Sequence, residues 1–96
     1  MNDFINLLTG LSTPGARVAL DSVDGDRIEV STVYAHDICM YETALCDSDG
    51  VHPVERYDSK EEALEGHKKW MNSKIGDTVT KLGYGDLVDS ETIVLS

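Results

Sequence analysis

The sequence predicts a small α+β domain, in which one amphipathic helix packs across an antiparallel sheet of three to five strands. Two features of the chain indicate this fold. Apolar and polar residues alternate in short runs between residues 16 and 57, as they do in strands with one buried face. Beyond residue 59 the apolar spacing changes to that of a helix. Runs of strands followed by one helix are typical of α+β domains.

The length of the chain allows one domain. Its 96 residues can form one modest hydrophobic core, and its 41% hydrophobic and 27% charged residues are typical of a folded globular protein. We divide the predicted domain into three parts. Residues 1–15 form a short helix and a turn, residues 16–76 form the sheet and the main helix, and residues 77–96 form an extension with a terminal strand.

A short helix is predicted near the N-terminus. Its apolar residues fall between residues 4 and 11, Asn2 or Asp3 can cap it, and Pro14 and Gly15 end it. The apolar run is only about five residues long and follows an acidic residue, so it resembles neither a signal peptide nor a membrane span. We therefore expect a cytoplasmic protein whose two cysteines are reduced.

The first two strands are predicted to form a hairpin. Val18 and Leu20 alternate with less apolar residues, and the alternation resumes at Ile28 and Val30. The sequence Asp-Gly-Asp at residues 24–26 separates the two runs. An Asp-Gly pair in this position is a strong hairpin signal, because glycine readily adopts the positive φ of a tight turn.

Residues 38–46 and 51–57 are predicted as the third and fourth strands, separated by the turn sequence Asp-Ser-Asp-Gly. Pro53 lies within the fourth run, and because proline has no N–H to donate, that strand is expected to be an edge strand or an irregular one. Residues 92–95, Thr-Ile-Val-Leu, predict a terminal strand that adds to a sheet edge in this chain or in a neighbouring copy.

The main helix is predicted over residues 60–75. Ser59 and Glu62 have the spacing of a capping box, and Gly76 suits the residue that ends such a helix. The residues predicted to share its packing face are Ala63, Leu64, His67, Met71, Lys74 and Ile75, with Trp70 at the margin.

Gly66 is unusual inside this helix, where a glycine costs about 1 kcal/mol relative to alanine. Its presence predicts the close backbone approach of a strand or of a partner chain. His67 follows it on the packing face, and we expect a structural histidine that hydrogen-bonds across the contact, with ligand binding or proton transfer as the alternative.

The chain is strongly acidic, because 18 acidic and 8 basic residues give a formal net charge of −10. Residues 1–59 have a net charge of −8, whereas residues 60–75 have +1 and residues 76–96 have −3. An acidic surface repels phosphate, so direct binding of nucleic acid or of an anionic membrane is not expected.

The acidic residues of the strands and turns allow two interpretations. They can keep a small sheet protein soluble and protect its edges. They can instead imitate a row of phosphates and bind a basic groove on another protein, because charge complementarity speeds association and fixes orientation. The residues that would make this contact are Asp21, Asp24, Asp26, Glu29, Asp47 and Asp49.

Four residues of the types that bind zinc follow the pattern H-x₂-C-x₆-C-x₅-H, namely His36, Cys39, Cys46 and His52. Their spacing matches no common zinc finger, so we expect no metal ion. A thiol nucleophile would combine Cys39 or Cys46 with His67 and Glu42, but no local feature of the sequence would activate either thiol. We therefore expect neither an enzyme nor a cofactor.

Three motifs occur within residues 28–71. They are Val-Ser-Thr-Val at residues 30–33, Glu-Thr at residues 42–43, and R-Y-x-S-x-E-E-A-x-x-G-H from Arg56 to His67. Together they resemble a family of small uncharacterised phage and prophage proteins. The chain differs from that family in its short connection at residues 35–40 and in its smaller residues at 44–46. The resemblance implies a phage or prophage origin and the cytoplasm of a host cell, but no activity and no catalytic residue.

The sequence thus favours a non-enzymatic phage or prophage accessory protein. It would bind a host or phage protein with a basic surface, for example to inhibit a host nucleic-acid-binding or defence protein. One alternative is a minor virion or assembly component that forms a homo-oligomer through the terminal strand or the N-terminal helix. A metal-dependent or thiol-dependent enzyme is the third hypothesis.

Overall fold

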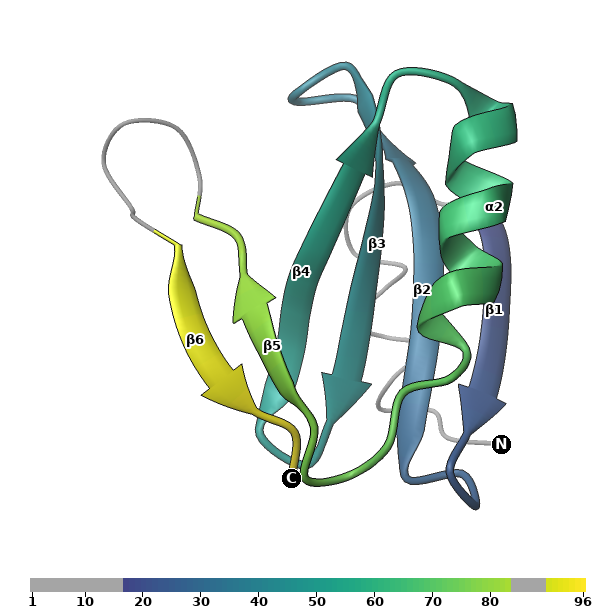
Figure 1. Cartoon of the computed structure of the whole chain (residues 1–96). Coiled ribbons are helices and arrows are strands. Elements are labelled where there is room, and N and C mark those ends of the chain that lie inside the picture. The colour runs from purple at the N-terminus through teal and green to yellow at the C-terminus, as the bar shows by residue number, and fades with distance from the viewer. Residues whose placement is uncertain (1–16, 84–89) are drawn as a thin grey trace.

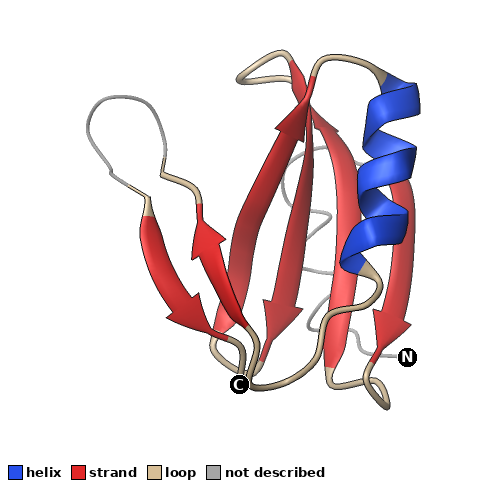
Figure 2. Cartoon of the chain, viewed as in Figure 1, coloured by secondary structure: helices blue, strands red, loops and turns tan. Residues whose placement is uncertain are grey.

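The computed structural model describes residues 17–83 and 90–96. In chain order its elements are β1 (Arg17–Val23), β2 (Ile28–Ala35), β3 (Met40–Asp47), β4 (Gly50–Tyr57), α2 (Lys60–Trp70), β5 (Thr78–Lys81) and β6 (Glu91–Val94). Strands β1 to β4 form an antiparallel meander in that order, and α2 crosses one face of it (Figure 1). Strands β5 and β6 form a second antiparallel sheet beside β4 (Figure 2).

This arrangement confirms the predicted α+β class, with the four-stranded sheet and the helix across it. The helix predicted between residues 4 and 11 lies outside the described residues. The two-stranded sheet was not predicted as a separate unit. The predicted terminal strand belongs to it, because β6 pairs with β5 of the same chain.

The hairpin of β1 and β2 is confirmed, but its loop has four residues, 24–27, because Val23 pairs with Ile28. Asp24, Gly25 and Asp26 all have positive φ, at 51°, 64° and 67°. The Asp24 carboxylate accepts hydrogen bonds from Arg27 Nη2 and from the backbone N–H of Ile75, both at 2.8 Å. Through the hydrogen bond to Ile75, the hairpin loop therefore also holds the segment that follows α2.

Strand β3 begins at Met40, two residues later than predicted, because Cys39 lies in the turn with a φ of 54°. The pairing of β3 with β4 shifts register between Thr43 and Ala44. As predicted, β4 is an edge strand of its sheet. The carbonyl of Pro53 accepts a hydrogen bond of 2.8 Å from the N–H of Leu82, next to β5.

The helix begins as predicted, with the N–H of Glu62 donating to Ser59 Oγ at 3.2 Å. It ends at Trp70, so the prediction that it continues to residue 75 was wrong. Beyond Trp70 the side chains of Asn72 and Ser73 donate to the carbonyls of Lys69 and Trp70. Such local bonds compete with continuation of a helix.

The packing face of α2 also differs from the predicted one. Its buried residues are Ala63, Gly66 and His67, whereas Leu64 and Met71 are exposed. The helix is thus rotated toward its smallest residues, which let it lie close to the sheet. The prediction placed Leu64 and Met71 on the packing face because it used apolar spacing alone. It did not consider that Gly66, the smallest residue, lets the helix approach the sheet most closely on its own side.

The hydrophobic core joins both sheets and the helix. Its buried centre consists of Ile28, Val30, Leu45, Val54 and Leu95, against which Val23, Trp70, Ile75, Val79 and Ile93 pack. Leu95 reaches this core from just beyond β6. Its N–H donates to the carbonyl of Asp77, and its own carbonyl accepts from Gly76.

We expect Leu95→Ala to lower the free energy of unfolding by about 2–5 kcal/mol, because it leaves a cavity at a core side chain. Val94→Ala is the matched control, since Val94 is 57% exposed while Leu95 is 1% exposed. The control should change the free energy by no more than about 0.5 kcal/mol. Urea denaturation measures both values, and equal losses would contradict this core.

Candidate functional site

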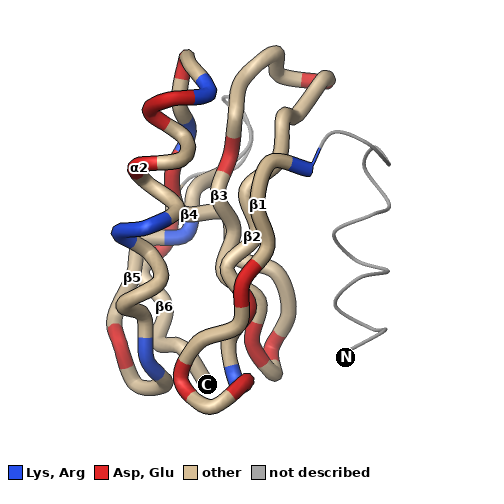
Figure 3. The backbone as a smooth tube through the Cα atoms, turned by 90° about the vertical axis from the view of Figure 1, so that its right-hand side faces the viewer, with Lys and Arg blue, Asp and Glu red and all other residues tan. Residues whose placement is uncertain are grey.

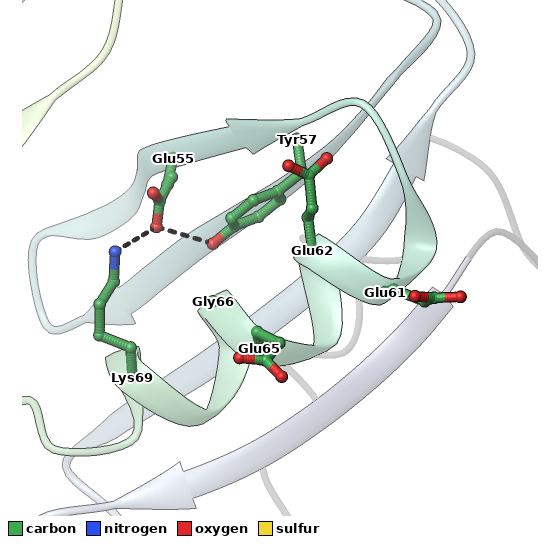
Figure 4. Close-up of a pocket in the computed structure, with 7 residues that line it drawn as sticks. All are labelled: Glu55, Tyr57, Glu61, Glu62, Glu65, Gly66 and Lys69. Carbon is green, nitrogen blue, oxygen red and sulfur yellow. Dashed lines mark hydrogen bonds and ion pairs between the residues drawn. The ribbon is translucent and has the colours of Figure 1, made fainter.

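An open groove of about 620 Å³ runs between β4 and α2 (Figure 4). The groove contains four carboxylates and one ammonium group, which leaves three excess negative charges. We call it the acidic groove, and its lining residues are Glu55, Tyr57, Glu61, Glu62, Glu65, Gly66 and Lys69.

Gly66 lets the Tyr57 ring lie directly against the helix. A side chain at Gly66 would overlap the ring and the hydroxyl group of Tyr57. The predicted close approach of a strand at Gly66 is therefore confirmed, but the approaching group is a side chain of the edge strand β4 and not its backbone. Tyr57 is 7% exposed, and burial raises the pKa of its hydroxyl to about 12.

Glu55 is the anchored carboxylate of the groove. Its Oε1 accepts hydrogen bonds from Lys69 Nζ at 2.7 Å, Trp70 Nε1 at 2.8 Å and Tyr57 Oη at 3.0 Å. Burial alone would raise the pKa of Glu55, but these donors outweigh it and lower the pKa. Glu55 is therefore held as a carboxylate.

Lys69 shows how the groove accommodates a cation. Its ammonium contacts the Glu55 carboxylate and also lies 5.2 Å from the centre of the Trp70 ring. A carboxylate beside an indole face attracts a cation through both charge and the ring quadrupole. The Lys69 side chain is 59% exposed, so solvent reaches this pair.

The other carboxylates of the groove are less constrained. Glu62 Oε1 accepts a hydrogen bond from Ser59 Oγ at 3.1 Å. Glu61 and Glu65 are exposed, and within residues 17–83 and 90–96 no hydrogen bond or ion pair holds them. Both project from the surface of α2, and Figure 4 shows Glu61 directed away from Glu55 and Tyr57. Their charges are therefore available to another molecule.

A line of hydrogen-bonded side chains crosses the sheet beneath α2 and ends in the groove. His67 Nε2 lies 2.8 Å from Asp21 Oδ2, and His67 Nδ1 lies 2.7 Å from Thr32 Oγ1. Thr32 Oγ1 lies 2.6 Å from Thr43 Oγ1, which Tyr57 Oη contacts at 3.1 Å. We call this line the buried chain, and in order its members are Asp21, His67, Thr32, Thr43, Tyr57 and Glu55.

The prediction that His67 bonds across the contact between helix and sheet is confirmed. Asp21, His67 and Thr32 have the order of an acid, base and hydroxyl group in a hydrolase, but Thr32 is 0% exposed. A substrate cannot reach that hydroxyl. The contacts instead tie α2 to β1 and β2.

The hairpin acids that the sequence suggested for partner binding separate into different roles. The turns after β1 and after β3 lie at the same end of the sheet, so Asp24, Asp26, Asp47 and Asp49 gather there (Figure 3). Asp26 and Asp49 are exposed, whereas Asp24 holds Ile75. Asp21 is engaged by His67.

Glu29 does not belong to this surface. It is 6% exposed and lies on the sheet face opposite α2, directly across from Cys46. Burial raises the pKa of Glu29. The sequence placed it among the contact residues because it alternates with buried apolar residues, but both faces of β2 are largely buried.

The buried carboxylate of Asp47 holds Ser96 through a hydrogen bond. Its Oδ1 accepts from His52 Nε2 at 2.8 Å and from the N–H of Asp49 at 2.9 Å, and its Oδ2 accepts from the N–H of Ser96 at 2.8 Å. Burial alone would raise the pKa of Asp47, but these hydrogen bonds lower it. Ser48 adds two further bonds to the Ser96 carbonyl oxygen.

The residues considered for zinc lie in two separate places. His36 and Cys39 are in the turn between β2 and β3, whereas Cys46 and His52 flank the turn at the opposite end of the sheet. No group of three or more metal-binding side chains forms within the described part of the chain. Cys46 is buried, and this burial raises the pKa of its thiol to about 12.

The residues considered for a thiol nucleophile do not lie close to one another either. Glu42 pairs with Arg56 on the sheet face opposite α2, at 2.9 Å, whereas His67 lies on the α2 side. Sequence reasoning found His67 but missed Glu55 and Tyr57, whose roles depend on contacts across strands. The pair Arg-Tyr before the capping box was noticed only as part of a family motif.

Comparison with known protein families, with curated proteins and with solved structures finds no match to this chain. Within residues 17–83 and 90–96, no helix is long and apolar enough to cross a membrane.

Asp47→Asn should lower the free energy of unfolding at neutral pH by about 1–3 kcal/mol, because buried donors lose a charged acceptor. A lowered pKa in the folded state means that Asp47 stabilises the fold above the ordinary carboxyl pKa of about 4 and that this contribution disappears as the pH falls. The variant should therefore lose less stability on acidification than the original protein. Urea denaturation across an acid pH series measures the difference.

Asp37→Asn is the control for this acid series. Asp37 is exposed in the turn at the other end of the sheet. The control should keep the acid dependence of the original protein. If Asp47→Asn keeps it as well, the proposed contribution of the Asp47 carboxylate is refuted.

Proposed function

We propose that this protein acts by binding a partner protein that presents basic side chains, and that the acidic groove is the contact surface. The observation that supports this most directly is the position of Lys69, whose ammonium sits between the Glu55 carboxylate and the Trp70 ring. A lysine or arginine side chain of a partner would fit the same chemistry. The neighbouring exposed carboxylates of Glu61 and Glu65 would attract it.

The groove is a better candidate than the hairpin end of the sheet. Asp24 and Asp47 at the hairpin end already accept internal hydrogen bonds, so their charges serve the fold. Glu61 and Glu65 carry no such bonds among the described residues. Charge that is free and grouped in a concave surface is the kind that steers association.

The resemblance to small phage and prophage proteins suggests where the partner belongs. A basic groove that normally receives nucleic acid is one such surface, and an acidic protein bound there would inhibit it by competition. In this proposal the protein itself catalyses no reaction.

Two charge-matched variants test the contact surface. Glu61→Gln with Glu65→Gln removes two charges from the groove, and Asp26→Asn with Asp49→Asn removes two from the hairpin end. All four positions are exposed, and the amide oxygen of Asp49→Asn can still accept the hydrogen bond that Ser96 Oγ donates to Asp49 Oδ2 at 2.6 Å, so both variants should keep the original melting temperature. We expect the groove variant to lose about tenfold or more in partner affinity and the hairpin variant to lose little, because close charge pairs carry the coupling.

The assay captures proteins from a lysate of lysogenic or infected cells, identifies them by mass spectrometry, and measures the affinity of the identified partner. Loss of affinity in the hairpin variant alone would move the contact to the hairpin end. Equal affinity of both variants and the original protein would refute binding through an acidic surface.

Assembly into a homo-oligomer is a second candidate, favoured by one observation. Among the described strands, β6 has a single hydrogen-bonded neighbour, β5, and Val94 on β6 is 57% exposed. Light scattering at high protein concentration should then show a defined oligomer that Val94→Lys reduces to a monomer. A monomer of the original protein at every concentration would exclude this candidate.

A further inference from the structure

The four-stranded sheet has a second face, opposite α2, and its side chains are buried as well. Alternation along the strands places Glu29 and Ser31 of β2 and Glu42 and Cys46 of β3 on this face. None of the four is more than 9% exposed, and Cys46 is only 1% exposed. Solvent would reach these side chains on an uncovered sheet, so another layer must lie over them.

None of the described elements supplies that layer. Helix α2 and strands β5 and β6 all lie on the other side of the four-stranded sheet (Figure 3). Their contacts agree with this position. His67 of α2 meets Thr32, and Val79 and Ile93 of the second sheet pack on the core that contains Leu45. The missing layer therefore comes from outside residues 17–83 and 90–96.

Of the two segments that remain, residues 1–16 suit this position better than residues 84–89. Residues 84–89 join β5 to β6, which pair as far as Lys81 and Glu91, so this loop has to reverse direction within its own length. Residues 1–16 lead directly into Arg17, where β1 begins beside β2. A helix of eight residues is about 12 Å long, which matches the roughly 10 Å across β2, β3 and β4.

The composition of residues 1–16 also matches that of the face. The segment has one acidic residue and no basic residue, although the whole chain has 18 acidic residues. Its apolar residues are Phe4, Ile5, Leu7, Leu8 and Leu11. The centre of the sheet face is likewise free of charge, and its small and apolar residues are Leu20, Val33, Ala44, Cys46, Val51 and Pro53.

Glu29 adds a polar requirement at one end of this face. Its Oε2 is buried and has no hydrogen-bond partner among the described residues. A buried carboxylate oxygen without a donor is unfavourable, so the covering layer should present one. Residues 1–16 contain uncharged donors in Asn2, Asn6, Thr9, Ser12 and Thr13.

We propose that residues 1–16 pack on the sheet face opposite α2, with the apolar side chains between residues 4 and 11 against β2, β3 and β4. We call these residues the N-terminal cover. The domain then has three layers, with the four-stranded sheet between α2 and the cover. The proposal does not depend on which partner the acidic groove binds.

The two cysteines make the cover measurable. Cys46 lies on the covered face and is buried, whereas Cys39 lies in the turn between β2 and β3 and is exposed. The rate at which Cys46 reacts with a thiol reagent therefore reports whether the cover is in place. Cys39 in the same molecule is the internal reference.

Nuclear Overhauser effects in the full chain test the packing directly. The methyl groups of Leu7, Leu8 and Leu11 should show these effects to the methyl groups of Val33 and Val51. Effects only to residues on the α2 side, or none to the opposite face, would overturn the proposal. Effects between labelled and unlabelled chains in a mixed sample would also overturn it, because a second copy would then supply the layer.

A variant with Leu7→Gln, Leu8→Gln and Leu11→Gln tests the apolar contact. In the original protein at pH 7 a maleimide should modify Cys39 quickly and Cys46 slowly, as located by mass spectrometry. In the variant Cys46 should react roughly tenfold faster or more, because solvent access lets its thiol ionise and lets the reagent reach it. The indole N–H resonance of Trp70 should persist, which shows that the α2 side stays folded.

The matched control replaces three exposed apolar residues on the other side of the sheet, with Leu64→Gln, Met71→Gln and Val94→Gln in one chain. It should leave the reaction rate of Cys46 unchanged. An equal acceleration in the control, or an unchanged rate in the cover variant, would refute the proposal. If the cover variant loses the Trp70 resonance, the Overhauser effects in the original chain decide.

Discussion

The contact between the Tyr57 ring and the bare backbone of Gly66 is the constraint on which the rest of the structure depends. Because Gly66 has no side chain, α2 can lie close enough to bury Ala63 and His67 against the sheet. The same approach brings the Tyr57 hydroxyl between Thr43 and Glu55. The position of α2 on the sheet, the hydrogen bonds to the Glu55 carboxylate and the buried chain thus all depend on the absence of a side chain at Gly66.

Local signals in the sequence predicted the parts of the fold that local physics determines. The Asp-Gly pair predicted the hairpin, Ser59 and Glu62 predicted the start of the helix, and Gly66 predicted a close approach. The path of the segment beyond the helix could not be predicted in this way, because Ile75 is held by Asp24 from a loop 51 residues away. The four-residue strand β5 was too short to give a periodic signal.

The candidate site could be predicted only in part for a related reason. Composition gives the number of acidic residues but not which of them receive N–H groups from distant segments. The Asp47 carboxylate accepts hydrogen bonds from His52, Asp49 and Ser96. The Asp24 carboxylate accepts hydrogen bonds from Arg27 and Ile75. Only once these internal partners are known do Glu61 and Glu65 stand out as exposed carboxylates without internal donors among the described residues.

The way Leu95 enters the core links the two sheets thermodynamically. Strands β5 and β6 form their own sheet, yet the side chain just beyond β6 fills the core of the other sheet. Detaching the β5–β6 ribbon would withdraw Leu95 and leave an empty volume among Ile28, Val30 and Leu45. The two sheets should therefore melt as a single cooperative unit, because local opening of the ribbon costs at least the free energy of the cavity that Leu95 leaves.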